Sequence, residues 1–242
     1  MMTPEATLQY MLDKAQRKLG TPLRRGFVQG GTRHDPKPGP LAEFVRNRDE
    51  TGLDLYLLAK TLATKEPYRV IYSAGWWARA LRLNDDTLIS RAWKRLEDRH
   101  LISRTRDGRV VVVTLLRDDG SGQPYERPAL KGESYGKLPL AYWRDGYFLR
   151  GQLDLAAKAT LLIALSQHGA FTLPAERAKQ WYGVSADTIE KGFATLRERN
   201  IITRMKDWRI NRYSRGGLAA TNVYRLRAPF ASSKEVELRV VS

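Results

Sequence analysis

The chain has 242 residues, with 42 lysines and arginines against 26 aspartates and glutamates, and a formal net charge of +16. Hydrophobic residues make up 42% of it, which excludes a disordered protein, and the lack of cysteine excludes disulfides, thiolate zinc sites and thiol nucleophiles. So large an excess of cations predicts a polyanionic partner, either nucleic acid or an acidic membrane surface. The longest apolar stretch, near residues 160–165, is too short to cross a bilayer, so we expect no membrane partner and a cytoplasmic protein.

Residues 1–40 are expected to hold a short helix followed by a basic arm. Residues 4–19 place apolar side chains at helical spacing. Residues 20–40 are rich in glycine and proline and carry several cations, which is typical of an unpacked arm or linker. Arg24 and Arg25 on this arm could follow a DNA groove, as flexible arms do, and a leader without function is equally compatible.

A first folded unit is expected at residues 41–117. Helical patterns are expected at 53–62, 76–83 and 86–99. A run of Val, Thr and Leu at 110–116 suits a buried strand.

Residues 118–137 contain four glycines and two prolines, which predicts a linker between two folded units. The second unit is expected at residues 138–230, followed by a tail at 231–242. Within that unit, helices are expected at 153–167, 174–182 and 186–200, followed by a basic, strand-like segment at 204–226 with a Gly216-Gly217 turn.

An internal repeat with an offset of 100 residues relates the two units, as when Asp54-Leu55 recurs as Asp154-Leu155. These two aspartates are interpreted as helix caps. The third helix of each unit has a candidate N-cap, Asp85 or Ser185, and Asn200 suits a left-handed residue that ends a helix. The apolar positions predicted to face the core in the third helices are Ile89, Trp93 and Leu96, and Ile189, Phe193 and Leu196.

The segments "WARALRL", "LISRTRDGRVVVV" and "AKQWYGVSADTIEKGFATLRERNIITR" resemble the winged helix-turn-helix domain. The resemblance covers both units, about three-quarters of the chain. It looks like the tandem winged-helix proteins of actinobacteria and their plasmids and phages, and it is similar, more loosely, to two-domain plasmid replication initiators. It implies a mainly α fold with small β-wings (α+β), built from two winged helix-turn-helix domains in tandem.

In that family the third helix enters the major groove and the wing contacts the backbone or the minor groove. In the second unit Asp187 and Glu190 would repel phosphates, so its third helix could instead mediate dimerisation or contact another protein. A solvated helix face is the alternative for both units. The outward positions proposed to contact DNA are Thr87, Ser90, Arg91, Lys94 and Arg95 in the first unit, and Thr188 and Lys191 in the second.

The charge pattern of the wings favours DNA contact more strongly than that of the third helices. Asp107-Gly108 predicts a tight hairpin turn in the first unit, and residues 204–227 hold seven cations against one acid in the second. Cations at these places would bind phosphates and make binding steeply dependent on salt. The wing residues proposed to contact DNA are Arg104, Arg106 and Arg109, and Arg204, Lys206, Arg209, Arg212 and Arg215.

The three histidines are scattered without metal-ligand spacing, and the sequence has neither a Walker-type loop nor a GxSxG elbow. We therefore expect no enzyme, no cofactor and no metal. The expected function is sequence-specific binding of double-stranded DNA by a nucleoid-associated transcriptional regulator, with a homodimer left open. The alternatives are a plasmid or phage replication initiator that binds origin repeats, a scaffold of a chromosome-organising complex, and an RNA-binding protein.

Overall fold

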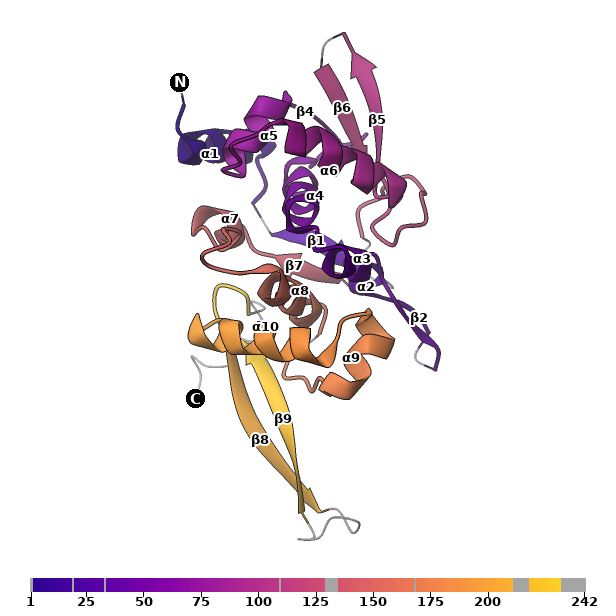
Figure 1. Ribbon diagram of the computed structural model, residues 1–242, viewed down its shortest axis with the longest axis vertical. Coiled ribbons are helices and arrows are strands. Elements are labelled where there is room, and N and C mark those ends of the chain that lie inside the picture. The colour runs from indigo at the N-terminus through magenta and orange to yellow at the C-terminus, as the bar shows by residue number, and fades with distance from the viewer. Residues whose placement is uncertain are drawn as a thin grey trace.

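The computed structural model (Figure 1) describes residues 2–18, 20–32, 34–108, 110–128, 135–167, 169–210 and 218–231. Within these residues the helices are accompanied by four small antiparallel sheets, so the chain has an α+β fold. The expected combination of helices with small sheets is confirmed at this level. The tail expected at 231–242 lies outside the described residues, apart from Ala231.

The N-terminal region is packed, so the expectation of an unpacked arm over residues 20–40 is wrong. Thr3 caps the first helix, because its hydroxyl accepts a hydrogen bond from the Ala6 N–H at 3.2 Å. Phe27 and Val28 follow within the supposed arm, and both are buried. The elements of this region are α1 (Pro4–Ala15), β1 (Thr21–Arg24), α2 (Arg25–Val28), β2 (Gln29–Gly31) and β3 (Pro36–Pro38).

The first unit combines four helices with a three-stranded sheet in the order β4-β6-β5. Ile89, Trp93 and Leu96 are buried as predicted, and Ala92 joins them on the inner face of α6. The strand β4 was not expected from the sequence. The elements are α3 (Leu41–Arg46), α4 (Glu50–Leu62), β4 (Arg69–Ile71), α5 (Ala74–Ala80), α6 (Thr87–Asp98), β5 (Ile102–Asp107) and β6 (Val110–Leu115).

The second unit likewise has four helices before its hairpin. Helix α10 packs closely on α8, because a Cβ added at Gly192 would collide with Thr160. Phe193 stacks on Tyr224 of the hairpin, with ring centroids 3.9 Å apart. The elements are β7 (Tyr135–Leu138), α7 (Ala141–Arg144), α8 (Leu155–Leu165), α9 (Ala175–Tyr182), α10 (Ala186–Glu198), β8 (Ile202–Ile210) and β9 (Leu218–Leu226).

A direct joint holds the two units together. Strand β1 pairs with β7, from Thr21 opposite Leu138 onwards, so part of the segment expected to be a linker is instead a strand. The Lys158 ammonium of α8 lies 2.7 Å from the Asp54 carboxylate and 2.9 Å from that of Glu50, both on α4. Asp54 is therefore inside a helix and pairs across the joint, which corrects its interpretation as a cap.

Asp154, by contrast, does cap its helix, since its carboxylate accepts a hydrogen bond from the Ala157 N–H at 2.8 Å. The two aspartates thus occupy equivalent positions in the sequence repeat and different positions in the structure.

A buried charge cluster lies beside the joint. Asp118, from the segment expected to be a linker, is fully buried and lies 3.0 Å from the guanidinium of Arg24 and 3.1 Å from the Lys60 ammonium. Burial alone would raise the pKa of Asp118, but Lys60 and the hydrogen bonds from Arg24 hold it below its usual value. Burial likewise lowers the pKa of Lys60 to about 8. Both ends of the supposed linker are thus part of the folded core.

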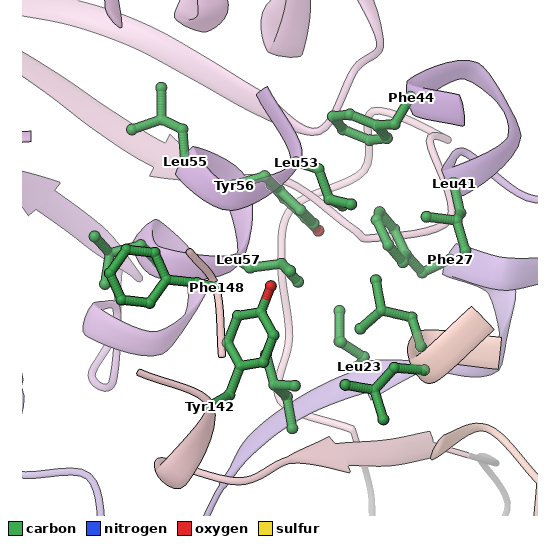
Figure 2. Packing of buried hydrophobic residues seen from close by; sticks show 14 of the residues in the cluster. Leu23, Phe27, Leu41, Phe44, Leu53, Leu55, Tyr56, Leu57, Tyr142 and Phe148 are labelled. Atoms are coloured by element: carbon green, nitrogen blue, oxygen red, sulfur yellow. The ribbon is translucent and has the colours of Figure 1, made fainter. Parts of the chain in front are cut away.

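The apolar core is continuous across the joint, as Figure 2 shows. Phe27 of the N-terminal region stacks on Tyr56 of α4, with ring centroids 5.3 Å apart, and also contacts Phe44 of α3. Tyr142 of the second unit points toward α4 and donates a hydrogen bond to Asp54 at 3.3 Å. The core therefore fixes how the two units sit relative to each other.

The hairpin of β2 and β3 reaches the second unit, where β3 contacts α9 (Figure 1). Gly183 ends α9 with a left-handed backbone, at a φ of 66°. A Cβ at this position would lie 2.6 Å from the Ala42 Cβ and 3.0 Å from the Pro38 Cβ. Glycine is therefore required here both for its conformation and for space.

Across the part of the chain that the structure describes, no helix combines the length and apolar character needed to cross a membrane.

Candidate nucleic-acid interface

Helix α6 presents an exposed polar face with two cations. Its start is fixed by Asp85, whose carboxylate accepts hydrogen bonds from the Thr87 N–H at 2.8 Å and from the Thr87 hydroxyl at 2.7 Å. The predicted N-cap is therefore off by one residue, since Asp86 occupies the cap position, although Asp85 does hold the first turn. Ser90, Arg91 and Lys94 follow on the exposed face. These three side chains are free to meet a ligand, whereas the hydroxyl of Thr87 is committed to Asp85.

The Arg95 side chain is not free on this face, because it pairs with Asp49. Its guanidinium donates two hydrogen bonds to Asp49, at 2.7 and 2.9 Å, and Arg99 pairs with the same carboxylate. Burial would raise the pKa of Asp49, but the two arginines lower it. Arg95 is therefore a structural tie between α6 and the N-cap of α4. Sequence reasoning missed Asp49, because the pair spans nearly fifty residues.

The hairpin of β5 and β6 lies next to α6. It turns at Asp107-Gly108, where Gly108 has a φ of 57°, so the predicted turn is confirmed. The Arg104 guanidinium donates two hydrogen bonds to one carboxylate oxygen of Glu97 in α6, at 2.6 and 3.0 Å. Arg106 is exposed, while Arg109 lies outside the described residues. Of the three arginines proposed here, Arg106 alone is described as exposed.

Helix α10 has a different outward face. Ser185 caps it as predicted, accepting a hydrogen bond from the Thr188 N–H at 3.2 Å. The Lys191 ammonium lies 3.4 Å from the carboxylate of Asp187, and both side chains are largely exposed. Glu190 is exposed beside them. The cation in the first half of this face is thus matched by acids, which makes it a poor surface for phosphates.

The hairpin of β8 and β9 is the longest in the described structure, with nine residues in each strand. Arg204 pairs with Tyr224, which packs on α10, so the even-numbered residues of β8 continue the face that looks toward that helix. Arg204, Lys206 and Trp208 are exposed there, and the Lys206 ammonium lies 5.8 Å from the centre of the Trp208 ring.

The other arginines proposed to contact DNA on this hairpin lie wholly or partly outside the residues that the structure describes. Arg212 and Arg215 are among residues 211–217, and of Arg209 only the backbone is described, paired with Ala219. Arg25, from the N-terminal region, is exposed and donates a hydrogen bond to Gln29 at 2.6 Å. Arg24 is buried on Asp118, so its proposed DNA contact is wrong.

Two apolar side chains on the second hairpin had no role in the sequence-based site. Trp208 is 59% exposed and Met205 is 55% exposed, on opposite faces of β8. They are single exposed side chains on different faces of the strand, so they do not form one apolar patch. The signal in the sequence was their alternation with cations along the strand.

The two hairpins point away from each other along the longest axis of the molecule, with α4 and α8 between them (Figure 1). Cations are therefore presented at both ends of a rigid body. No group of three or more His, Asp and Glu side chains that could hold a metal ion occurs among the described residues. Comparison of the sequence with known family models and with curated proteins gave no match.

Proposed function

We propose that both units are winged helix-turn-helix domains and that the chain binds double-stranded DNA in a sequence-specific way. The observation that carries this proposal is the face of α6, where Ser90, Arg91 and Lys94 are exposed, together with the exposed Arg106 on the hairpin that follows this helix. Neither Arg91 nor Lys94 forms an ion pair with another described residue. A helix with free cations beside a basic hairpin matches the shape and charge of a major groove and its flanking phosphates.

The two units would divide the work. Helix α6 would read base edges, since an arginine can make a bidentate contact with guanine. The second unit would contribute affinity through its long hairpin, where Arg204 and Lys206 would bind phosphates without reading sequence. Two DNA-binding units on one chain can replace a dimer, so the proposal does not require a second copy.

A transcriptional regulator on the bacterial nucleoid is the role that we favour, and a replication initiator is the nearest alternative. Both would bind through the same surfaces, and footprinting of the preferred sites separates them, by showing promoters or iterated origin repeats. The acidic face of α10, with Asp187 and Glu190 exposed, favours a protein contact for that helix. A scaffold role would therefore centre on α10.

The test uses the full chain and fluorescence anisotropy with duplex DNA, first of random sequence and then of sequences selected by the protein. We expect micromolar binding to random duplex that weakens steeply with salt, and tighter binding to selected sites. Arg91→Glu/Lys94→Glu should weaken binding to selected sites by about 100-fold, because two favourable contacts become repulsive.

Lys14→Glu/Arg144→Glu is the matched control, since it makes the same change of charge at exposed positions on α1 and α7. It should lower affinity much less than the α6 variant. Equal losses in the two variants would show that only net charge matters, and no binding by the wild type at low salt would refute the proposal.

A further inference from the structure

A second basic site lies away from α6 and from both long hairpins. It is a pocket of about 650 Å³ between the end of α1, the end of α4 and strand β7. That volume is in the usual range for a small-molecule site. No aspartate or glutamate is among its described lining residues, whereas five cations line it, namely Arg17, Lys18, Lys65, Arg127 and Lys137.

Hydrogen bonds to backbone carbonyls hold the walls of the pocket in place. Arg17 donates to the carbonyl of Thr61 at 2.7 Å and to that of Lys60 at 3.0 Å, at the end of α4. Arg127 donates to the carbonyl of Thr64 at 2.8 Å, and the Thr64 hydroxyl donates to that of Ala15 at 2.9 Å. These bonds tie the end of α1, the end of α4 and the segment at Arg127 to one another, so these walls are in place before any ligand binds.

Among the residues that the structure describes, no acid forms an ion pair with the cations of the pocket. The two arginines are bound to neutral carbonyls, and the three lysines are exposed without an ion pair to any described residue. Burial lowers the pKa of Arg17, and the positive charge of Arg127 lowers it further. A bound anion would relieve this repulsion.

The pocket also has apolar walls, formed by Ala15, Pro22, Pro128 and the half-buried ring of Tyr135. The Lys137 ammonium lies 5.9 Å from the centre of that ring. A flat aromatic group could therefore stack on Tyr135 while an attached anion meets the lysines.

We infer that this pocket binds a nucleoside phosphate, with the phosphates on the lysines and the base on Tyr135. The same chemistry is offered by a free nucleotide and by a nucleotide within a single strand. The site does not depend on duplex binding by α6, because none of its lining residues belongs to α6 or to the hairpins.

The experiment is isothermal titration calorimetry of the full chain with three probes, namely ATP, tripolyphosphate and a short oligothymidylate. We expect the wild type to bind ATP or the oligothymidylate. Lys18→Glu/Lys65→Glu/Lys137→Glu should weaken that binding at least tenfold, on the order expected from several lost charge contacts. Arg91→Glu/Lys94→Glu should leave it unchanged, which separates this site from the proposed duplex surface.

Tyr135→Leu tests the base contact, because it keeps an apolar side chain and removes the ring. It should weaken binding of the nucleotide probes by about 5- to 100-fold and leave tripolyphosphate binding within about twofold. Thermal unfolding of each variant checks that it remains folded. Stronger binding of ATP identifies a free nucleotide as the ligand, and stronger binding of the oligothymidylate identifies a strand.

The inference would be overturned if the wild type bound none of the probes, or if the triple lysine variant bound them as the wild type does. Equal loss of ATP and tripolyphosphate binding in Tyr135→Leu would overturn the stacked base.

Discussion

Helices α6 and α10 occupy equivalent places in the two units and carry opposite charge patterns. Helix α6 has no acidic residue before Glu97 and exposes Arg91 and Lys94, whereas α10 exposes Asp187 and Glu190. The hairpins differ in length. Each strand of the hairpin after α6 has six residues, and each strand of the hairpin after α10 has nine. The apolar frame of a repeated unit can therefore be kept while the charged surfaces diverge, which allows two units of one chain to do different work.

The two units form one folded body, and removal of the Lys158 ammonium is expected to weaken the contact between them most. Lys158→Met should lower the free energy of unfolding by about 3–5 kcal/mol, because it leaves the buried Asp54 without its cation. Urea unfolding followed by circular dichroism measures this loss. The control Lys60→Met should cost less, since Asp118 keeps Arg24 as a partner. A loss below about 1 kcal/mol for Lys158→Met would mean that the Lys158 ion pairs do not hold the units together.

The joint should also respond to pH. Burial raises the pKa of Asp54 to about 6, although the Lys158 ammonium opposes the shift. The folded state therefore binds a proton more tightly than the unfolded chain, so the contribution of Asp54 to stability is present below pH 4 and is lost as the pH rises through 6. Asp54→Asn removes this titration.

The stability of Asp54→Asn relative to the wild type should thus increase by on the order of 2 kcal/mol between pH 4 and pH 7. Urea unfolding of both proteins across this range measures the difference. A constant difference would show that Asp54 keeps its ordinary pKa.

The contrast between the hairpins can be tested by the salt dependence of duplex binding. Arg204→Ala/Lys206→Ala should make the slope of log affinity against log salt shallower by about 2, because each lost phosphate contact changes it by about 0.9. Arg106→Ala on the first hairpin should change it by about 1. Both variants should weaken binding to all sequences alike. An unchanged slope in the double variant would assign the second hairpin to another partner.

The smallest expected effect comes from making α10 resemble α6. Asp187→Asn/Glu190→Gln removes two exposed acids and should strengthen duplex binding by about 3- to 10-fold, if α10 lies near the phosphates. The control Glu5→Gln/Asp13→Asn removes two acids from α1 and should have little effect. Equal gains in both variants would place α10 away from the DNA and would favour its role as a protein contact.

Local patterns predicted the frame of each unit well. The spacing of Ile89, Trp93 and Leu96 gave the inner face of α6, and Ser185 gave the start of α10, because both depend on neighbours within a few residues. Asn200 adopts the predicted left-handed backbone at the end of α10, with a φ of 57°. His100 adopts the same conformation at the equivalent position of the repeat, which its residue type did not indicate.

Contacts between distant residues could not be predicted in this way. A run rich in glycine and proline gives no sign that Arg24 will meet Asp118, or that β1 will pair with β7. The pair between Arg95 and Asp49 likewise joins two helices, and it removed a cation from the predicted site. Candidate residues on a helix face are therefore reliable only after their ion pairs are known.

The pairing of β1 with β7 also has a consequence for the order of events during synthesis. Thr21 leaves the ribosome long before its partner Leu138, and Arg24 must wait for Asp118. The helices of the first unit can form early. Strand β1 can pair with β7 only after residues 135–138 have emerged. A fragment cut at residue 117 would lack both partners, so each half of the chain completes part of the structure of the other.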